Sequence, residues 1–234
     1  MKGPKTEKIR DLFNSIAEDY DKLNHILSLG VDRTWRKRAI KCIAEDKPQR
    51  ILDIACGTGD FSLEIARRTN PETMIVGLDL SEGMLEVMDR KVAEAGLSGR
   101  ISTRQGNSEA MDFADDSFDR VTIAFGIRNF ENRETALKEI LRILKPGGRL
   151  VILELSVPSN TVLRWFYNLY FTKVLPWIGG AVSGDKAAYS YLPASVIQFP
   201  GKEEWMATMS SCGYKEVRHK AFTFGICRMY TGEK

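Results

Sequence analysis

A chain of 234 residues is long enough for one α/β domain with additions, and two independent cores would be crowded. Its 43% hydrophobic content is ordinary, and a net charge of +3 without a long basic run gives no reason to expect nucleic acid. No metal-ligand or disulfide spacing links the four cysteines, Cys42, Cys56, Cys212 and Cys227. We therefore expect neither a metal nor a disulfide.

The N-terminus lacks the apolar core of a signal peptide, and no charge-free apolar run reaches about 18 residues. A cytoplasmic enzyme is expected. Residues 1–48 predict helices: apolar residues recur at helical spacing from Ile9 to Tyr20, and Asp32 is expected to cap a second helix. The polar segment 19–25 between them is either a solvated connection or a lid over the cofactor.

Residues 51–60, Ile-Leu-Asp-Ile-Ala-Cys-Gly-Thr-Gly-Asp, predict a buried strand, a sharp glycine turn and the start of a helix. Asp60 can cap that helix. This order opens a nucleotide-binding βαβ unit, although a turn that merely connects two elements stays open. No third glycine follows Gly57 and Gly59, and the carboxylates of Asp53 and Asp60 would repel a pyrophosphate. S-adenosylmethionine, which is cationic and lacks phosphate, suits the turn better than NAD.

A second buried strand ends in Asp79, which follows Gly57 by 22 residues, close to the roughly 20 expected for an acid that binds a ribose diol. Asp79 could also cap a helix, but Ser81 already suits that role. The third strand, 101–105, precedes Asn107 and Ser108, which could bind an adenine or simply form a turn.

The fourth strand, 118–125, precedes Arg128 and Asn129, and a fifth strand is expected over 149–155. Strands that alternate with helices predict a doubly wound, mostly parallel sheet, whose ligands bind beyond the carboxyl ends of the strands. A helix over 201–211 and a hairpin over 214–230 extend the sheet to seven strands. The expected single domain comprises a helical lid (1–48), a cofactor-binding core (49–156), a substrate-side insert (157–200) and a C-terminal helix and hairpin (201–234).

Residues 161–182 are unusually aromatic and carry only Arg164 and Lys173 as charges. Three interpretations stay open: a helix packed in the core, a homodimer contact, or a helix that lines an apolar substrate groove or lies in the membrane interface. Burial in the core is the favoured interpretation for most of these side chains, and some of them can at the same time line an apolar entrance for a substrate.

Several of these motifs resemble class I methyltransferases, namely the turn 53–60, the strand that ends in Asp79, and residues 144–148. More specific stretches resemble the ubiquinone/menaquinone biosynthesis C-methyltransferases: 20–24 with Trp35-Arg36, 125–129, and 189–192. The likeness runs from about Ile9 to the C-terminus. It departs at Cys56, Asp32 and Ala124, where relatives often carry glycine, histidine and serine.

This resemblance implies a Rossmann-like fold and S-adenosylmethionine-dependent methylation of a ring carbon in a reduced, polyprenylated quinone precursor. Demethylmenaquinol is the expected substrate; a ubiquinone-pathway benzoquinol, both quinols, or a small molecule methylated on oxygen or nitrogen are alternatives. Cofactor contacts are expected at Asp53, Gly57, Thr58, Gly59, Asp79, Leu80, Asn107 and Ser108. Peripheral contact with the inner membrane face is also expected.

The ring carbon becomes a good nucleophile once an adjacent hydroxyl, with a pKa near 10, loses its proton. Arg128 is the expected stabiliser of that phenolate, and Asn129 would orient the ring oxygen. Tyr20, Asp21 or His25 could relay the proton, and His25 has the most suitable unperturbed pKa. An exposed position without a catalytic role is the alternative for His25.

Overall fold

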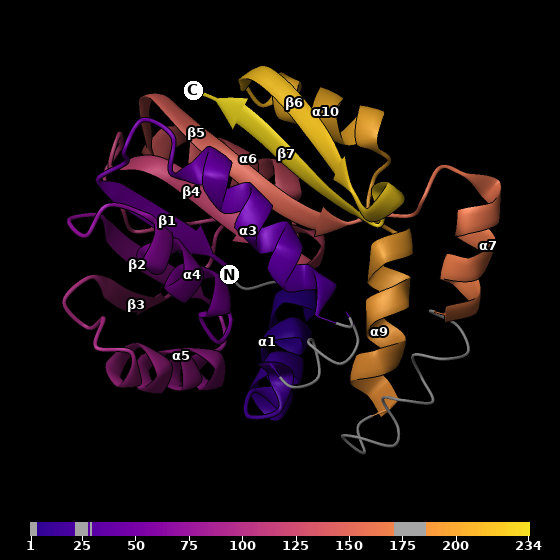
Figure 1. Cartoon of the computed structure of the whole chain (residues 1–234), viewed down its shortest axis with the longest axis horizontal. Coiled ribbons are helices and arrows are strands. Elements are labelled where there is room, and N and C mark those ends of the chain that lie inside the picture. Colours follow the sequence, from indigo (N-terminus) through magenta and orange to yellow (C-terminus); the bar gives the residue numbers. More distant parts are fainter. Residues whose placement is uncertain (1–3, 22–27, 29, 171–185) are drawn as a thin grey trace.

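The computed structural model describes residues 4–21, 28, 30–170 and 186–234 (Figure 1). Its centre is a seven-stranded sheet with the order β3-β2-β1-β4-β5-β7-β6. The strands are β1 (Arg50–Ile54), β2 (Met74–Asp79), β3 (Ile101–Gln105), β4 (Phe118–Ala124), β5 (Leu144–Leu155), β6 (Lys215–Phe222) and β7 (Cys227–Glu233). Strands β1 to β5 are parallel, and β7 runs antiparallel to β5 and β6. The predicted doubly wound, mostly parallel sheet and its C-terminal hairpin are confirmed.

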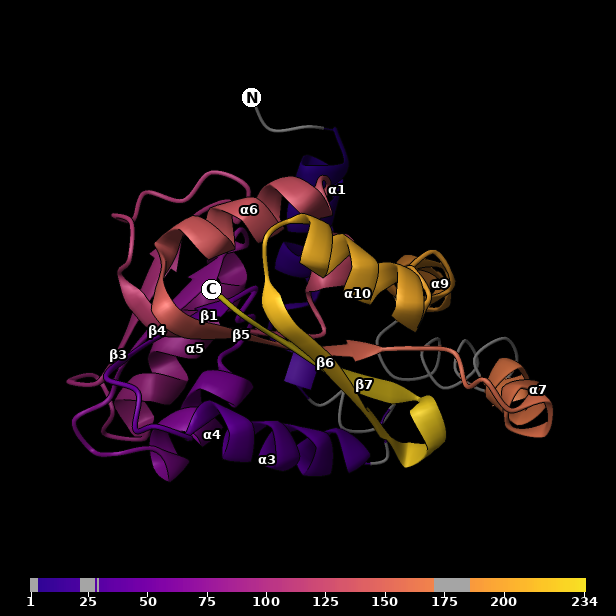
Figure 2. The same cartoon turned by 90° about the horizontal axis from the view of Figure 1, so that it is seen from above.

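Helices cover both faces of the sheet. They are α1 (Pro4–Ile16), α3 (Val31–Ile43), α4 (Asp60–Arg68), α5 (Glu82–Glu94), α6 (Arg133–Ile143), α7 (Thr161–Leu169), α9 (Lys186–Ile197) and α10 (Lys202–Ser211), with short 3-10 turns η1 (Ile127–Asn129) and η3 (Thr223–Gly225). Figure 2 shows α6 and α10 on one face and α3 and α4 on the other. Within the described ranges, no helix is long and apolar enough to cross a membrane.

Alternating strand residues supply a separate apolar core on each face. Leu52 and Ile54 of β1 belong to the core under α6 and α10, whereas Ile51 belongs to the core under α3, α4 and α5. Each of these three side chains is essentially inaccessible to solvent. Burial of one such side chain stabilises the fold by roughly 1.5–3 kcal/mol, so a strand that is apolar on both faces is held firmly in the middle of the sheet.

Three residues were predicted to cap helices, and the structure confirms one of these predictions and corrects the other two. Ser81 caps α5, because its hydroxyl accepts a hydrogen bond from the Met84 N–H at 3.1 Å. Asp60 and Asp32 are not caps: α4 and α3 begin one or two residues earlier, after Gly59 and Gly30 in left-handed conformations. Both carboxylates therefore lie in a first helical turn, where the helix dipole favours them, and each binds a side chain elsewhere.

Two element bounds also differ from the sequence prediction. Helix α1 ends at Ile16, so Tyr20 lies beyond it, and β5 begins at Leu144 instead of Arg149. The pairing of β4 with β5 changes register between Phe118 and Arg120. That irregularity accommodates the Pro-Gly-Gly segment inside the strand, where proline cannot donate to the ladder.

The order in which successive strands are added to the sheet reverses between β1 and β4, two parallel strands that lie side by side although β2 and β3 separate them in sequence. The loops that leave these strands diverge and create a crevice where ligands bind in doubly wound sheets. Both loops contain a non-glycine residue with positive φ, Ala55 at 52° and Phe125 at 62°. A Cβ on Gly126 would lie 2.5 Å from the Ala55 Cβ, so glycine is required where the loops touch.

Candidate active site

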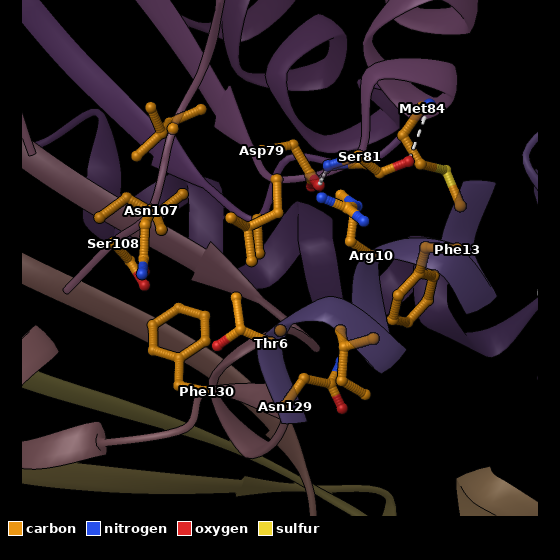
Figure 3. A pocket seen from close by; sticks show the side chains of 18 of the residues that line it. Thr6, Arg10, Phe13, Asp79, Ser81, Met84, Asn107, Ser108, Asn129 and Phe130 are labelled. Atoms are coloured by element: carbon orange, nitrogen blue, oxygen red, sulfur yellow. Dashed lines mark hydrogen bonds between the residues drawn. The ribbon is translucent and has the colours of Figure 1, made fainter. Parts of the chain in front are cut away.

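A first cavity lies beyond the carboxyl ends of β1, β2 and β4 and is closed on one side by α1 (Figure 3). Five of the predicted cofactor residues line it: Gly57, Asp79, Leu80, Asn107 and Ser108. Helix α1 contributes four further side chains, from Thr6, Ile9, Arg10 and Phe13. The β1–β2–β3 half of the sheet and the N-terminal helix therefore enclose this space together.

Asp79 is fixed in the first cavity by backbone donors. Its Oδ2 atom accepts the Gly57 N–H and its Oδ1 atom accepts the Ser81 N–H, both at 2.9 Å. Burial raises the pKa of the Asp79 carboxyl, and these backbone hydrogen bonds oppose the rise. Figure 3 shows the Arg10 side chain extending from α1 toward this carboxylate. A carboxylate held in this way can accept hydrogen bonds from both hydroxyls of a ribose.

Asn107 and Ser108 lie at a different side of the cavity from Arg10 and Met84 (Figure 3). Asn107 Oδ1 accepts the Glu109 N–H at 3.0 Å, which fixes its amide, and Ser108 is buried. Leu78 and Leu80 also line the cavity. Polar groups beside aliphatic side chains suit an adenine, and the Asp79 carboxylate adds an acceptor for hydroxyl groups, so the residues present fit S-adenosylmethionine.

A second cavity of about 420 Å³ adjoins the first. Its lining is mainly apolar and comes from α3, α7, η3 and the loops after β1, β4 and β5. The two cavities share five lining residues: Tyr20, Ala55, Gly57, Ala124 and Phe125. This shared wall contains both strained non-glycine residues of the crevice, and such strain concentrates at functional sites.

Arg128 lines the second cavity and forms a buried ion pair with Glu154 of β5. The Arg128 Nη1 atom lies 2.8 Å from Glu154 Oε1 and also donates to the Phe125 carbonyl, and Nε donates to Ser195 Oγ at 3.2 Å. Glu154 is fully buried, and its Oε2 and Oε1 atoms also accept the backbone N–H groups of Arg128 and Leu155. A carboxylate satisfies three donors that no neutral side chain of this size could serve equally well.

The adjacent predicted residue, Asn129, lies elsewhere. The turn η1 directs it to the first cavity, where its Oδ1 atom accepts the Tyr191 hydroxyl at 2.8 Å. Arg128 and Asn129 therefore serve different cavities. Tyr20 lies in the shared wall, and His25 lies outside the described residues.

The remaining predicted cofactor residues do not line the first cavity. Thr58 lines the second cavity and donates its hydroxyl to Asp21. Asp53 lines the second cavity too, and its carboxylate accepts hydroxyls from Ser62 at 2.5 Å and Thr122 at 2.7 Å. Gly59 is the left-handed residue before α4, where a Cβ would meet the Met88 side chain.

A chain of charges connects the N-terminal segment to the glycine turn. Lys91 Nζ lies 2.6 Å from Asp21 Oδ2 and also donates to Asp60, which in turn accepts Arg36 Nη1 at 3.3 Å. Asp21 therefore binds both Thr58 and Lys91. These contacts place Asp21 against the glycine turn, and the lid interpretation of residues 19–25 stays a prediction.

Sequence reasoning did not identify Glu154, Arg10 or Phe13 as site residues. The sequence could have indicated Glu154, because it is the one charged residue within the apolar run 150–155 of a strand that is buried on both faces. No sequence pattern indicates Arg10 and Phe13, because they reach the cavity only through the tertiary packing of α1 across the crevice.

The fold is that of the class I methyltransferases. Solved structures agree on the fold: an S-adenosylmethionine-dependent methyltransferase from Aquifex aeolicus superposes with a TM-score of 0.62 at 14% identity, over 85% of this chain and 88% of that one. The [4+2]-cyclase SpnF superposes with a TM-score of 0.67 at 18% identity, over 88% of this chain and 81% of that one. This chain belongs to the ubiE/COQ5 methyltransferase family, whose profile matches residues 1–234. It is an S-adenosylmethionine-dependent methyltransferase.

Two relatives are more similar in sequence. The Geobacter sulfurreducens protein named ubiquinone/menaquinone biosynthesis C-methyltransferase is 53% identical over 98% of this chain and 90% of its own length. The Bacteroides fragilis demethylmenaquinone methyltransferase is 44% identical over 99% and 94%. The resemblance noted in the sequence motifs is confirmed.

Proposed function

We propose that this enzyme transfers the methyl group of S-adenosylmethionine to a ring carbon of a reduced, polyprenylated quinone precursor, with demethylmenaquinol as the substrate. The shared wall is the observation that best supports this proposal: the apolar cavity, with the buried Arg128 guanidinium in its lining, directly adjoins the first cavity, to which we assign the cofactor. The names of the relatives add demethylmenaquinone and ubiquinone chemistry as the candidate substrates.

The proposed reaction begins with loss of the proton from the hydroxyl next to the ring carbon that is methylated. The phenolate pushes electron density onto that carbon, which attacks the sulfonium methyl in line. A carbon–carbon bond forms, the carbon–sulfur bond breaks, and neutral S-adenosylhomocysteine leaves. Loss of the ring proton then restores the aromatic ring. Positioning of the two reactants in adjoining cavities supplies much of the rate, since it removes translational freedom.

Arg128 is the proposed stabiliser of the phenolate. A guanidinium carries only N–H donors and no acceptor, so Arg128 acts as a hydrogen-bond donor and not as the base. Its Nη1 and Nε atoms already bind protein groups, whereas Nη2 has no hydrogen-bond partner among the described residues. Glu154 fixes the guanidinium plane, which leaves the Nη2 donors for a ligand in the cavity.

Tyr20 and Asn129 complete the proposed catalytic set, with His25 as the third candidate for proton relay. Tyr20 belongs to both cavities, so its hydroxyl could contact cofactor and substrate at once. Asn129 lines the first cavity, and its side chain is oriented by Tyr191. We propose that Asn129 acts from the cofactor side of the shared wall.

The polyprenyl tail is proposed to leave along α7, which presents two different apolar faces. Leu163, Tyr167 and Tyr170, in and directly after the helix, line the second cavity. Val162, Trp165 and Leu169 are exposed on the helix, with Trp165 61% accessible. An exposed aliphatic and indole stripe beside the cavity fits contact with a membrane surface, where the tail of the substrate resides.

The central experiment measures methyl transfer from labelled S-adenosylmethionine to reduced demethylmenaquinone, beside the corresponding benzoquinol. We expect C-methylated naphthoquinol as the main product. Equal rates on both quinols would mean that the enzyme methylates both and is not specific for demethylmenaquinol. Transfer to neither quinol would refute the proposed function. Arg128→Gln should lower turnover at least about tenfold, as expected for loss of a charged hydrogen bond, while cofactor affinity is unchanged.

Membrane contact has its own test. Replacement of Val162, Trp165 and Leu169 together by serine should reduce sedimentation with vesicles of phosphatidylethanolamine and phosphatidylglycerol, and should spare activity on a tail-less quinol. Met74→Ser is the matched control, since Met74 is 46% exposed at the opposite, amino end of β2. Sedimentation of the triple variant equal to that of the control would contradict the membrane proposal.

A further inference from the structure

A second guanidinium, that of Arg36 on α3, also lines the apolar cavity. It lies 5.8 Å from the centroid of the Phe125 ring, and its side chain is largely buried, at 13% exposure. A guanidinium that is largely removed from water donates stronger hydrogen bonds than an exposed one. The role proposed for Arg128 leaves Arg36 without a function.

The polar contacts of Arg36 leave one accessible nitrogen without a hydrogen bond. Nη1 donates to Asp60 Oδ2 at 3.3 Å, and Nη2 lies 3.7 Å from Asp32 Oδ2, which is an ion pair but too long for a hydrogen bond. The Nε–H is buried out of reach of any ligand, as is the nearby Asp32 Oδ2 atom, and neither has a hydrogen-bond partner in the described part of the chain. Nη2 is therefore the donor of Arg36 that a ligand oxygen in the cavity can accept.

The two guanidinium groups contact different parts of the same residue. Arg128 donates to the Phe125 carbonyl, whereas Arg36 lies against the Phe125 ring. A hydroquinol carries two oxygens on opposite sides of its ring. One lies next to the methylated carbon, and the other lies across the ring from it.

We propose that Arg36 binds the second ring oxygen of the quinol, the one remote from the methylated carbon, while Arg128 binds the first. This assignment rests on the proposed quinol substrate. It makes Arg36 the residue that selects a hydroquinol over a phenol with a single hydroxyl. The carboxylates of Asp32 and Asp60 orient the guanidinium and balance its charge.

The structure allows this role to be tested without loss of the fold. Asp60 keeps Lys91 as a partner when Arg36 is replaced, and Asp32 keeps the Ser28 hydroxyl at 2.7 Å. Arg36→Gln is therefore expected to fold. Arg38→Gln is the matched control, since Arg38 lies on the same helix, packs over the Phe222 ring at 5.6 Å and does not line the cavity.

The experiment compares two ligands on wild type, Arg36→Gln and Arg38→Gln. One is a short-tailed demethylnaphthohydroquinol, followed as a substrate. The other is its monohydroxy analogue, which keeps only the hydroxyl next to the methylated carbon and is measured as a competitive inhibitor. We expect Arg36→Gln to raise KM for the hydroquinol about tenfold, the effect of one charged hydrogen bond, and to leave Ki of the analogue unchanged. Arg36→Lys should recover part of the loss, and Arg38→Gln should match wild type.

Equal weakening of both ligands by Arg36→Gln would indicate a structural role and overturn the assignment, as would no effect on either ligand. Failure of the proposed function looks different, because wild type would then methylate no hydroquinol at all. Arg128→Gln separates the two residues further: it should weaken the monohydroxy analogue, which retains the oxygen assigned to Arg128.

Discussion

Arg128 Nη1 and Glu154 Oε1 lie 2.8 Å apart in a pair whose side chains are 6% and 0% exposed. The two residues are 26 positions apart, on the turn after β4 and at the end of β5, and the pair joins these neighbouring strands where the apolar cavity begins. Water screens such a pair weakly, so removal of one partner leaves an uncompensated charge in a low-dielectric region.

Because the two charges compensate each other, we expect the losses of stability caused by substitution of Arg128 and of Glu154 to be strongly non-additive. Arg128→Met or Glu154→Met alone should each lower the free energy of unfolding by about 3–5 kcal/mol, because each leaves a buried charge without its partner. The double variant should be more stable than either single variant. Urea denaturation of all three proteins at neutral pH measures this, and a double variant whose loss equals the sum of the single losses would contradict the coupling.

Asp79→Ala should weaken S-adenosylmethionine binding by roughly 10–100-fold, since charged hydrogen bonds to a ribose diol contribute about 1.5–3 kcal/mol. Isothermal titration calorimetry measures the dissociation constant, and circular dichroism verifies the fold. Asp112→Ala removes an equal charge from a side chain that is 97% exposed, so it serves as control. Unchanged affinity in the Asp79 variant would remove Asp79 from the cofactor site.

The layout of the fold was predictable because its signals are local. Apolar runs such as 51–54 and 150–153 can only be buried strands, and Ser81 precedes a helical pattern at capping distance. The convergence of Gly57, Asp79 and Asn107 followed from a rule about parallel strand ends, and all three line the first cavity. Helix caps were less predictable: a glycine with positive φ can start a helix just as an aspartate can, which is why Asp60 and Asp32 were misassigned.

The substrate side was harder, because its contacts are distant in sequence. Nothing in the spacing relates Arg36 to Phe125 or Arg128 to Glu154. Adjacent residues can also diverge: the single turn η1 sends Arg128 to one cavity and Asn129 to the other. A sequence pattern places residues on an element, but only tertiary packing decides which cavity each side chain reaches.

Asp53 makes stability depend on pH. Burial raises its pKa to about 6, despite hydrogen bonds from Ser62 and Thr122 and the nearby charge of Arg36, which lower it. The folded state therefore favours the protonated acid. This contribution is fully present below the unfolded pKa of about 4 and is lost as pH rises through about 6.

Asp53→Asn should remove this dependence, because the amide is uncharged and can still bond both hydroxyls. The free energy of unfolding of the variant relative to wild type should rise by roughly 2 kcal/mol between about pH 4 and pH 7, since each pKa unit corresponds to about 1.36 kcal/mol and half of the unfolded acid is still ionised near pH 4. Urea denaturation at several pH values measures the difference, with Asp112→Asn as the exposed control. A difference that stays constant with pH would refute the assignment.

Helix α1 should respond to S-adenosylmethionine, because Thr6, Ile9, Arg10 and Phe13 form one side of the first cavity, which we propose holds the cofactor. Polar contacts hold the helix near its two ends: the Thr6 hydroxyl donates to Glu131 at 2.6 Å, and Asn14 accepts the Ser81 hydroxyl at 2.6 Å. A ligand that fills the cavity adds contacts to the closed position of α1 and shifts its equilibrium away from local unfolding.

S-adenosylhomocysteine should therefore slow tryptic cleavage after Lys8 and Arg10, as followed by mass spectrometry. Cleavage after Arg67 and Arg68, at the end of α4, should not change, since neither residue lines the cavity. Asp79→Ala should lose the protection at ligand concentrations that protect wild type, which ties the effect to the cofactor-binding cavity. Equal cleavage of α1 with and without ligand would mean that the cofactor binds without engaging α1.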